Sequence, residues 1–176
     1  MATFYHVTSN DSAQKILQEG ANPEFQGTNA GRQNGAGFSV CSNLTDLTYW
    51  ANKLFNSEPA IIAVNGDTLR IMPHGQVKSY FTNEGKDFVM LMVTRGYATL
   101  SQPGEHYYYP TDKAYALHGV TLEMCKENFM LEIGIELSVL GAIIADLGYD
   151  GYDLEEETVI TNWQKLTPDK FSLYKA

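Results

Sequence analysis

The stretch LGYDGYDLEEETVIT, residues 147–161, holds the pattern on which the fold prediction depends most. Its last four residues, 158–161, are all β-branched and predict a strand. Three glutamates, Glu155, Glu156 and Glu157, lead directly into this strand. A triple glutamate is usually a solvated loop, so its meaning depends on what the rest of the chain supplies.

The residues before this stretch predict one strand and one short helix. Residues 129–137 alternate between apolar and polar side chains and favour a half-buried strand, with a helix as the alternative. Ser138 is expected to cap a helix that runs to Leu147 and stops at Gly148.

The rest of the chain predicts two helices among several strands. A short strand ends at His6. Ser9, Asn10 and Asp11 offer cap oxygens for a helix that stops at Gly20 in the position of a left-handed C-cap. Residues 43–56 show the clearest helical stripe. Further strands are predicted at residues 38–41, 60–64, 87–94 and 171–174, with 68–72 pairing back as a hairpin, and loops at 20–37 and 103–110.

These elements predict an α+β fold. Strands outnumber helices, and the two do not alternate regularly, which argues against a doubly wound sheet. With 176 residues and no internal repeat or linker, residues 1–176 are expected to form a single compact domain.

Charge and cysteine content exclude several function classes. The chain has 12 basic and 21 acidic residues and a net charge of −9, which disfavours a nucleic-acid-binding surface. Two cysteines are too few for a disulfide framework or a four-thiolate zinc site, and the four histidines show no metal-ligand spacing, so no metal site is expected. Phosphate-binding glycine motifs and the common hydrolase motifs are also missing.

The sequence predicts a protein that does not enter a membrane. Residues 1–10 lack the pattern of a secretory signal, and the longest apolar stretch, 139–145, is far shorter than the ~20 residues of a membrane span. We expect a cytoplasmic protein, acting in the cell that makes it or in a cell that receives it.

Two further segments have the residue types of a binding site. One is Tyr5-His6-Val7-Thr8-Ser9, a histidine at a strand end followed by hydroxyl groups. The other runs from Gly37 to residue 41 and is followed by a helix with neighbouring aromatic residues, Tyr49 and Trp50. Taken singly, such a histidine is more often structural, and such an aromatic pair more often belongs to the core.

In order and spacing, the three segments together resemble the ADP-ribosyltransferase superfamily, in the branch of diphtheria toxin and the poly-ADP-ribose polymerases. That branch has a strand with Tyr-His-Gly-Thr-Ser, a strand with Gly, an apolar residue and Tyr followed by an aromatic eleven positions later, and a late Gly-Tyr-Asp-Gly before a strand that starts with Glu. Here Ser39 and Trp50 are eleven positions apart, and Glu157 begins the late strand. The resemblance implies one ADP-ribosyltransferase-like domain of two facing β-sheets with flanking helices.

This sequence departs from the family pattern at three positions. Val7 stands where a glycine usually lets the backbone approach the nicotinamide amide, and Ser39 replaces a stacking tyrosine. Trp50 stands where tyrosine is usual, with Tyr49 one residue earlier. Trp50 lies at the edge of the apolar helical stripe and is favoured as the residue that stacks on nicotinamide, but a shift of one residue would exchange it with Tyr49.

The resemblance implies that the co-substrate is NAD and assigns roles to the matching residues. Glu157 would face the positive charge that develops when the nicotinamide–ribose bond breaks. His6 would bind the adenosine ribose, with Val7, Thr8, Gly37 and Ser39 beside it. Arg32 is the one strong cation of the 20–37 loop and is expected to contact the pyrophosphate.

The expected activity is mono-ADP-ribosyl transfer, as a free-standing effector or toxin. Glu155 precedes Glu157 by two residues, which in arginine-modifying relatives marks a glutamate that contacts the acceptor. The acidic balance favours a protein or small-molecule acceptor over nucleic acid. There are two alternatives: an NAD glycohydrolase, and an inactive module that binds NAD or ADP-ribose.

Overall fold

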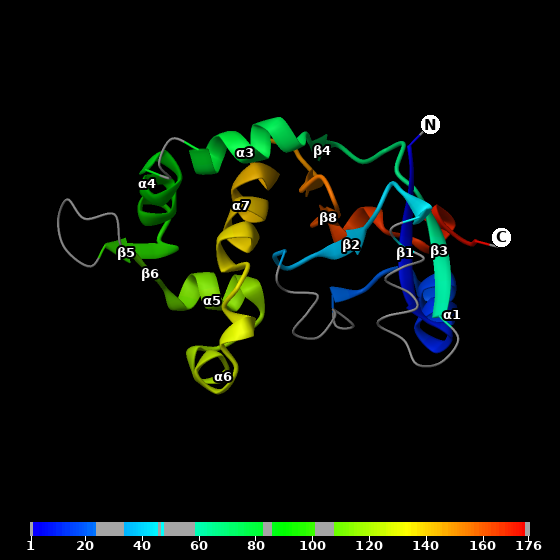
Figure 1. The fold of residues 1–176 in the computed structure, drawn as a ribbon, viewed down its shortest axis with the longest axis horizontal. Helices are drawn as coiled ribbons and strands as arrows, with labels where there is room; N and C mark the ends of the chain where they lie inside the picture. Colours follow the sequence, from blue (N-terminus) through cyan, green and yellow to red (C-terminus); the bar gives the residue numbers. More distant parts are fainter. Residues whose placement is uncertain are drawn as a thin grey trace.

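The computed structural model describes residues 2–23, 34–45, 47, 59–82, 86–100 and 108–174 (Figure 1). Within these residues the structure is mixed α+β, so the predicted fold class is confirmed. The described strands form three small sheets instead of the expected two. Both chain ends lie on the side of the three-stranded sheet (Figure 1).

The three-stranded sheet has β3 (Pro59–Asn65) between β1 (Thr3–Ser9) and β9 (Phe171–Leu173), all antiparallel. In β3, Ala60, Ile62 and Val64 are buried, because alternate side chains of a strand point to the same face of the sheet. Strands are confirmed near the predicted positions. The predicted strand end at His6 is wrong, because β1 continues to Ser9 in its pairing with β3, and His6 lies in the middle of β1, opposite Ile62.

Helix α1 (Asn10–Glu19) follows β1 without a loop. The Ser9 hydroxyl accepts a hydrogen bond from the Ser12 amide, so Ser9 is the N-cap among the three candidates, and Asn10 and Asp11 lie inside the helix. Gly20 ends the helix with φ 83° and ψ 179°, so it has positive φ but is not in the left-handed helical conformation that was expected. A Cβ at Gly20 would lie 2.5 Å from the carbonyl oxygen of Leu166, which leaves room only for glycine.

The four-stranded sheet has the order β2 (Phe38–Val40), β8 (Thr158–Ile160), β7 (Gly151–Asp153) and β4 (Ile71–Met72). Strand β4 runs parallel to β7, so the expected hairpin between residues 68–72 and 60–64 is wrong. Two hydrogen bonds between Arg70 and Asp150 hold β4 beside β7 instead. The Arg70 amide donates to the Asp150 carboxylate at 2.8 Å, and the Asp150 amide donates to the Arg70 carbonyl at 2.7 Å.

The two larger sheets share a hydrophobic core. Phe38, Val40 and Ile160 of the four-stranded sheet pack in one cluster with Ile62 and Val64 of the three-stranded sheet. An isolated bridge joins Tyr5 of β1 to Cys41 just after β2, with two backbone hydrogen bonds of 2.8 Å. Strands β1 and β2 are therefore held next to each other.

A helical layer packs on the other side of the four-stranded sheet, around α7 (Figure 1). Its helices are α3 (His74–Thr82), α4 (Lys86–Thr94), α5 (Asp112–His118), α6 (Leu122–Glu127) and α7 (Ile135–Ala145), with the short sheet of β5 (Ala98–Leu100) and β6 (Tyr108–Pro110). Among the described residues, one 3₁₀ turn, η3 (Phe129–Leu131), precedes α7, and two more, η4 (Trp163–Lys165) and η5 (Pro168–Lys170), lie between β8 and β9.

The strand predicted at residues 87–94 is wrong, because this segment forms helix α4. Phe88 and Met92, four residues apart, are the two side chains of α4 that are fully buried in the core. A segment rich in Val, Met and Leu fits both the two-residue period of a strand and the 3.6-residue period of a helix. Packing of one face against the core selects the helix.

The strand favoured at residues 129–137 is also wrong. Gly134, with φ 94°, separates η3 from α7, which starts three residues before the predicted cap at Ser138. Ser138 is buried inside the helix. Helix α7 ends at Ala145, close to the expected stop at Gly148.

Of the helix expected at residues 43–56, residues 44, 45 and 47 are helical and Leu47 is buried, and the rest lies outside the described residues. Among the helices that the structure describes, none has the length and apolar character needed to cross a membrane.

Candidate functional site

The His6 ring is held in one orientation between β1 and β2. Its Nδ1 lies 2.7 Å from the carbonyl oxygen of Ser39, and the ring stacks on Phe38 with centroids 4.1 Å apart. A carbonyl oxygen can only accept, so Nδ1 bears the proton. Burial lowers the pKa of the His6 imidazole from its ordinary value, with the Ser39 hydrogen bond acting against this shift. The neutral ring leaves the Nε2 lone pair as a hydrogen-bond acceptor.

Glu157 precedes β8 at the end of the β7–β8 hairpin. The hairpin loop is closed by a hydrogen bond of 2.8 Å from the Leu154 amide to the Glu157 carbonyl. The half-buried Glu157 carboxylate accepts a hydrogen bond of 2.6 Å from the side-chain amide of Asn34. The site therefore contains a carboxylate whose position is fixed by a residue far away in the sequence.

A tight turn at residues 34–37 lies against this carboxylate. The Tyr152 hydroxyl donates to the Asn34 carbonyl at 2.6 Å, and the Ala36 amide donates to the Ser138 hydroxyl at 2.7 Å. Gly35 has φ 94°, and a Cβ there would lie 2.2 Å from the Tyr152 hydroxyl. Burial, and secondly the negative charge of Glu157, raise the pKa of Tyr152, which keeps its hydroxyl protonated as a donor.

The three sequence segments meet on neighbouring strands. The bridge between Tyr5 and Cys41 holds β1 beside β2, and Ser39 of β2 is paired with Val159 of β8. His6 of β1 contacts the Ser39 carbonyl, and Glu157 lies two residues before Val159. Residues from three distant parts of the chain thus lie in one region of the four-stranded sheet and its β1 neighbour.

The other predicted site residues lie in β1 and directly before β2. Val7 and Thr8 follow His6 in β1, opposite Ile61 and Ala60 of β3. Val7 points to the opposite face of the sheet from His6, because successive side chains alternate. Gly37 packs so tightly on β8 that a Cβ would lie 2.4 Å from a Val159 methyl group.

Glu155 is placed differently from Glu157. Its side chain is 78% exposed and lies 3.4 Å from the Nε2 of His74 in α3. Its backbone has φ 78°, an unusual value for a residue other than glycine, and its amide donates to the Asp153 carboxylate at 2.8 Å. Glu155 therefore lies on the exposed edge of the hairpin loop, outside the hydrogen bonds that fix Glu157.

Three predicted site residues, Arg32, Tyr49 and Trp50, lie outside the described residues. The choice between Trp50 and Tyr49 as the stacking residue thus stays a prediction.

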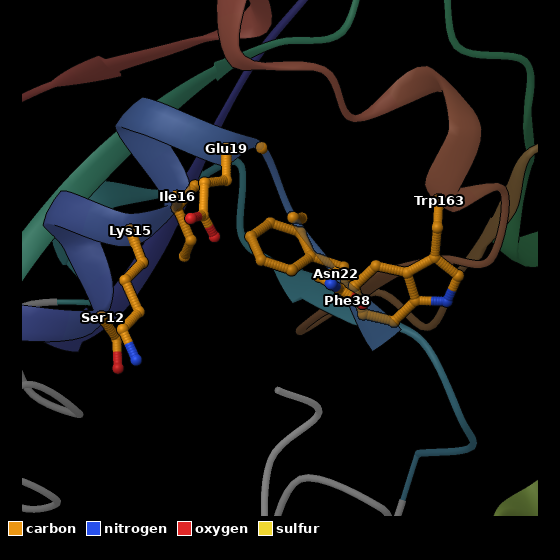
Figure 2. A pocket seen from close by; sticks show the side chains of 9 residues that line it. Ser12, Lys15, Ile16, Glu19, Asn22, Phe38 and Trp163 are labelled. Atoms are coloured by element: carbon orange, nitrogen blue, oxygen red, sulfur yellow. The ribbon is translucent and has the colours of Figure 1, made fainter. Parts of the chain in front are cut away.

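A hollow lies beside Phe38, the ring on which His6 stacks. Figure 2 shows the α1 side chains on one side of it and Phe38 with Trp163 on the other. The Phe38 and Trp163 rings meet edge to face, with centroids 6.0 Å apart. The residues that line the hollow are Ser12, Lys15, Ile16, Glu19, Gly20, Ala21, Asn22, Phe38 and Trp163.

The sequence interpretation missed Asn34, Tyr152 and the pocket-lining role of Trp163. Asn34 stands in a polar, glycine-rich stretch of sequence, and nothing local distinguishes it from its neighbours. Tyr152 lies within the stretch 147–161 but received no role there, and Trp163 lies outside the three segments. The roles of Asn34 and Tyr152 come from contacts between distant residues: Tyr152 and Asn34 are 118 positions apart, and Asn34 and Glu157 are 123 positions apart.

Among the described residues, no group of three or more His, Cys, Asp or Glu side chains is arranged to hold a metal ion. Comparison with protein-family models, with curated proteins and with solved structures finds no match to this chain.

Proposed function

We propose that this chain is an NAD-dependent mono-ADP-ribosyltransferase of the ADP-ribosyltransferase superfamily. One observation carries the proposal: His6, Ser39 and Glu157, which come from the three segments of the family pattern, lie on or next to three neighbouring strands. Sequence spacing does not require this proximity, since β1, β2 and β8 are separated by long intervening segments. The packing of two larger sheets around one core is compatible with the two-sheet domain that the family has.

The adenosine half of NAD would bind between His6 and the hollow of Figure 2. The Nε2 of neutral His6 can accept a hydrogen bond from a ribose hydroxyl. The adenine ring would enter the hollow beside Phe38 and Trp163, whose faces and edges suit a flat heteroaromatic ring. The backbone at Val7, Thr8, Gly37 and Ser39 would line the path toward the nicotinamide.

Glu157 would act on the bond that breaks. When the bond between ribose C1′ and the nicotinamide nitrogen cleaves, nicotinamide leaves with the electron pair, and positive charge develops on the ribose. A fixed carboxylate that accepts a hydrogen bond from the 2′-hydroxyl stabilises this charge more in the transition state than in bound NAD. The nucleophile of the acceptor then bonds to C1′ and loses its proton.

The remaining roles follow the family resemblance. Trp50 or Tyr49 would hold the departing nicotinamide ring, and Arg32 would contact the pyrophosphate. Glu155, exposed beside the fixed Glu157, is in a suitable place to meet an acceptor that approaches from solvent. A protein or a small molecule with a nucleophilic group is the acceptor class proposed.

The experiment is incubation of the protein with labelled NAD and a cell lysate, with Glu157→Ala as the control. Transfer of label to a macromolecule or small molecule in the lysate, lost in Glu157→Ala, supports the transferase. Release of nicotinamide without transfer supports an NAD glycohydrolase in place of the transferase. Binding of NAD without either reaction supports an inactive binding module, which the departures at Val7 and Ser39 would explain.

A further inference from the structure

We infer that Asn34 is a positioning residue that holds the Glu157 carboxylate in its working orientation. The turn that carries Asn34 is itself held by hydrogen bonds with Tyr152 and Ser138. The inference rests on the proposed function, because it assigns a role toward the reaction that Glu157 would promote. No part of the sequence pattern pointed to Asn34.

The contact itself is short and its direction is fixed. The Asn34 Nδ2 lies 2.6 Å from the Glu157 Oε2. An ionised carboxylate can only accept, so the amide nitrogen faces it as donor. A hydrogen bond to a charged acceptor is stronger than one between neutral groups, and it restricts a side chain that otherwise has three rotatable bonds. Within the described part of the chain, no hydrogen bond to the other carboxylate oxygen, Oε1, is found, and this oxygen would accept from a ribose hydroxyl.

Asn34 can hold Glu157 because its own backbone is held. Its carbonyl accepts from the Tyr152 hydroxyl at 2.6 Å, and Tyr152 is fully buried. Two residues later, the Ala36 amide donates to the buried Ser138 hydroxyl, which also lies 2.6 Å from the Nδ1 of His118. Strand β7, through Tyr152, and the helical layer, through Ser138, thus support the turn together.

The adjacent glutamates show what this support changes. Glu155 and Glu156 are exposed, and Glu155 pairs with His74 on the outside of the loop. Only Glu157 of the three is half-buried and receives the amide of Asn34. The same residue type, three times in sequence, is therefore separated by tertiary contacts into one positioned carboxylate and two exposed ones.

A positioning role and a merely structural one have different consequences. If Asn34 only stabilises the fold, its removal lowers the free energy of unfolding and leaves kcat unchanged. If it orients Glu157, kcat falls while the KM for NAD changes little, because orientation acts mainly in the transition state. A matched control exists in Asn162, whose side-chain amide donates to the Asp150 carboxylate at 2.9 Å in an equally half-buried place.

The experiment measures nicotinamide release from NAD by wild type, Asn34→Ala and Asn162→Ala, together with thermal stability. We expect Asn34→Ala to lose about 10- to 100-fold in kcat with KM within about threefold. Asn162→Ala should keep its kcat while losing stability. An Asn34→Ala protein with wild-type kcat overturns the inference, and so does a loss of activity that only follows the loss of folded protein.

A second comparison places the effect at Glu157. In a Glu157→Ala background there is no carboxylate to orient, so adding Asn34→Ala should not lower the residual rate further. A further drop of the same factor as in the wild-type background would mean that Asn34 acts elsewhere, and the inference would be wrong. Wild-type protein that does not cleave NAD overturns the proposed function itself, and this inference with it. Active wild type with an unaffected Asn34→Ala overturns the inference alone.

Discussion

Replacing Glu157 with glutamine tests the proposed chemistry with little change of shape. The glutamine Oε1 can still accept the hydrogen bond that Asn34 donates to the carboxylate at 2.6 Å. Its backbone carbonyl still closes the β7–β8 loop through the Leu154 amide. The substitution therefore removes the negative charge and keeps the side chain in place.

The size of the effect follows from the position of the charge. At an effective dielectric of ~20, suited to a group near the surface, two unit charges ~4 Å apart attract by about 4 kcal/mol. Glu157 is half-buried, so this regime applies. Loss of most of that attraction in the transition state costs about 3 kcal/mol or more, which corresponds to ~10²-fold in kcat.

The assay is release of nicotinamide from labelled NAD at saturating concentration, with thermal unfolding measured on the same preparations. Glu156→Gln is the matched control, because it makes the same chemical change one residue earlier on an exposed side chain. We expect Glu156→Gln to behave as wild type, and both variants to unfold within a few degrees of it.

Turnover of NAD by Glu157→Gln at the wild-type rate would refute the reasoning. The positive charge of the transition state would then be stabilised by another group, and Glu155 and Glu156 would be the next side chains to test. If Glu157→Gln were inactive because it is unfolded, the thermal unfolding measurement would show this. Loss of the fold is thereby distinguished from loss of the charge.

Other predictions concern the support of the site and the adenosine end. Tyr152→Phe should lower the free energy of unfolding by about 1 kcal/mol in denaturant titration, because the half-buried carbonyl of Asn34 loses the hydrogen bond from the Tyr152 hydroxyl. His6→Asn retains a side-chain donor but cannot titrate. Because folding lowers the pKa of His6, wild type should lose stability as the pH falls below ~6.5, and the variant should lose less. Equal acid sensitivity of the two proteins would contradict this. His6→Ala should raise the KM for NAD more than it lowers kcat, and the opposite split would contradict contact with the distant ribose. In Trp50→Phe, where Trp163 is the only tryptophan, NAD should still change the fluorescence, and an unchanged spectrum would exclude the hollow as the adenine site.

Elements with local signals could be predicted from the sequence. The start of α1 at the Ser9 cap and its end at Gly20 follow from the side-chain oxygen and from the positive φ that glycine tolerates. The β-branched run of β8 and the apolar run of β3 also correspond to strands in the structure. In these cases the preference of a few adjacent residues is strong enough to determine the local conformation.

Segments with mixed signals could not be assigned in this way. The apolar residues of α4 and of the segment before α7 fit both a period of two and a period near four. The helix wins because Phe88 and Met92 pack on the core, and because Gly134 starts α7 at a position that alternation does not reveal. Burial against elements far away in sequence supplies the free energy that local preference leaves undecided.

In the candidate site, too, some features follow from the local sequence and others from tertiary contacts. By itself, the sequence determined the pattern of His6, Ser39 and Glu157, and the strand that follows the glutamates. Only the tertiary structure decided which of the three glutamates is held, since the donor, Asn34, lies 123 positions away. Bringing two residues so far apart in sequence into contact has an entropic cost that the packing of the sheets and the helical layer must offset, so no pattern of neighbouring residues encodes the contact.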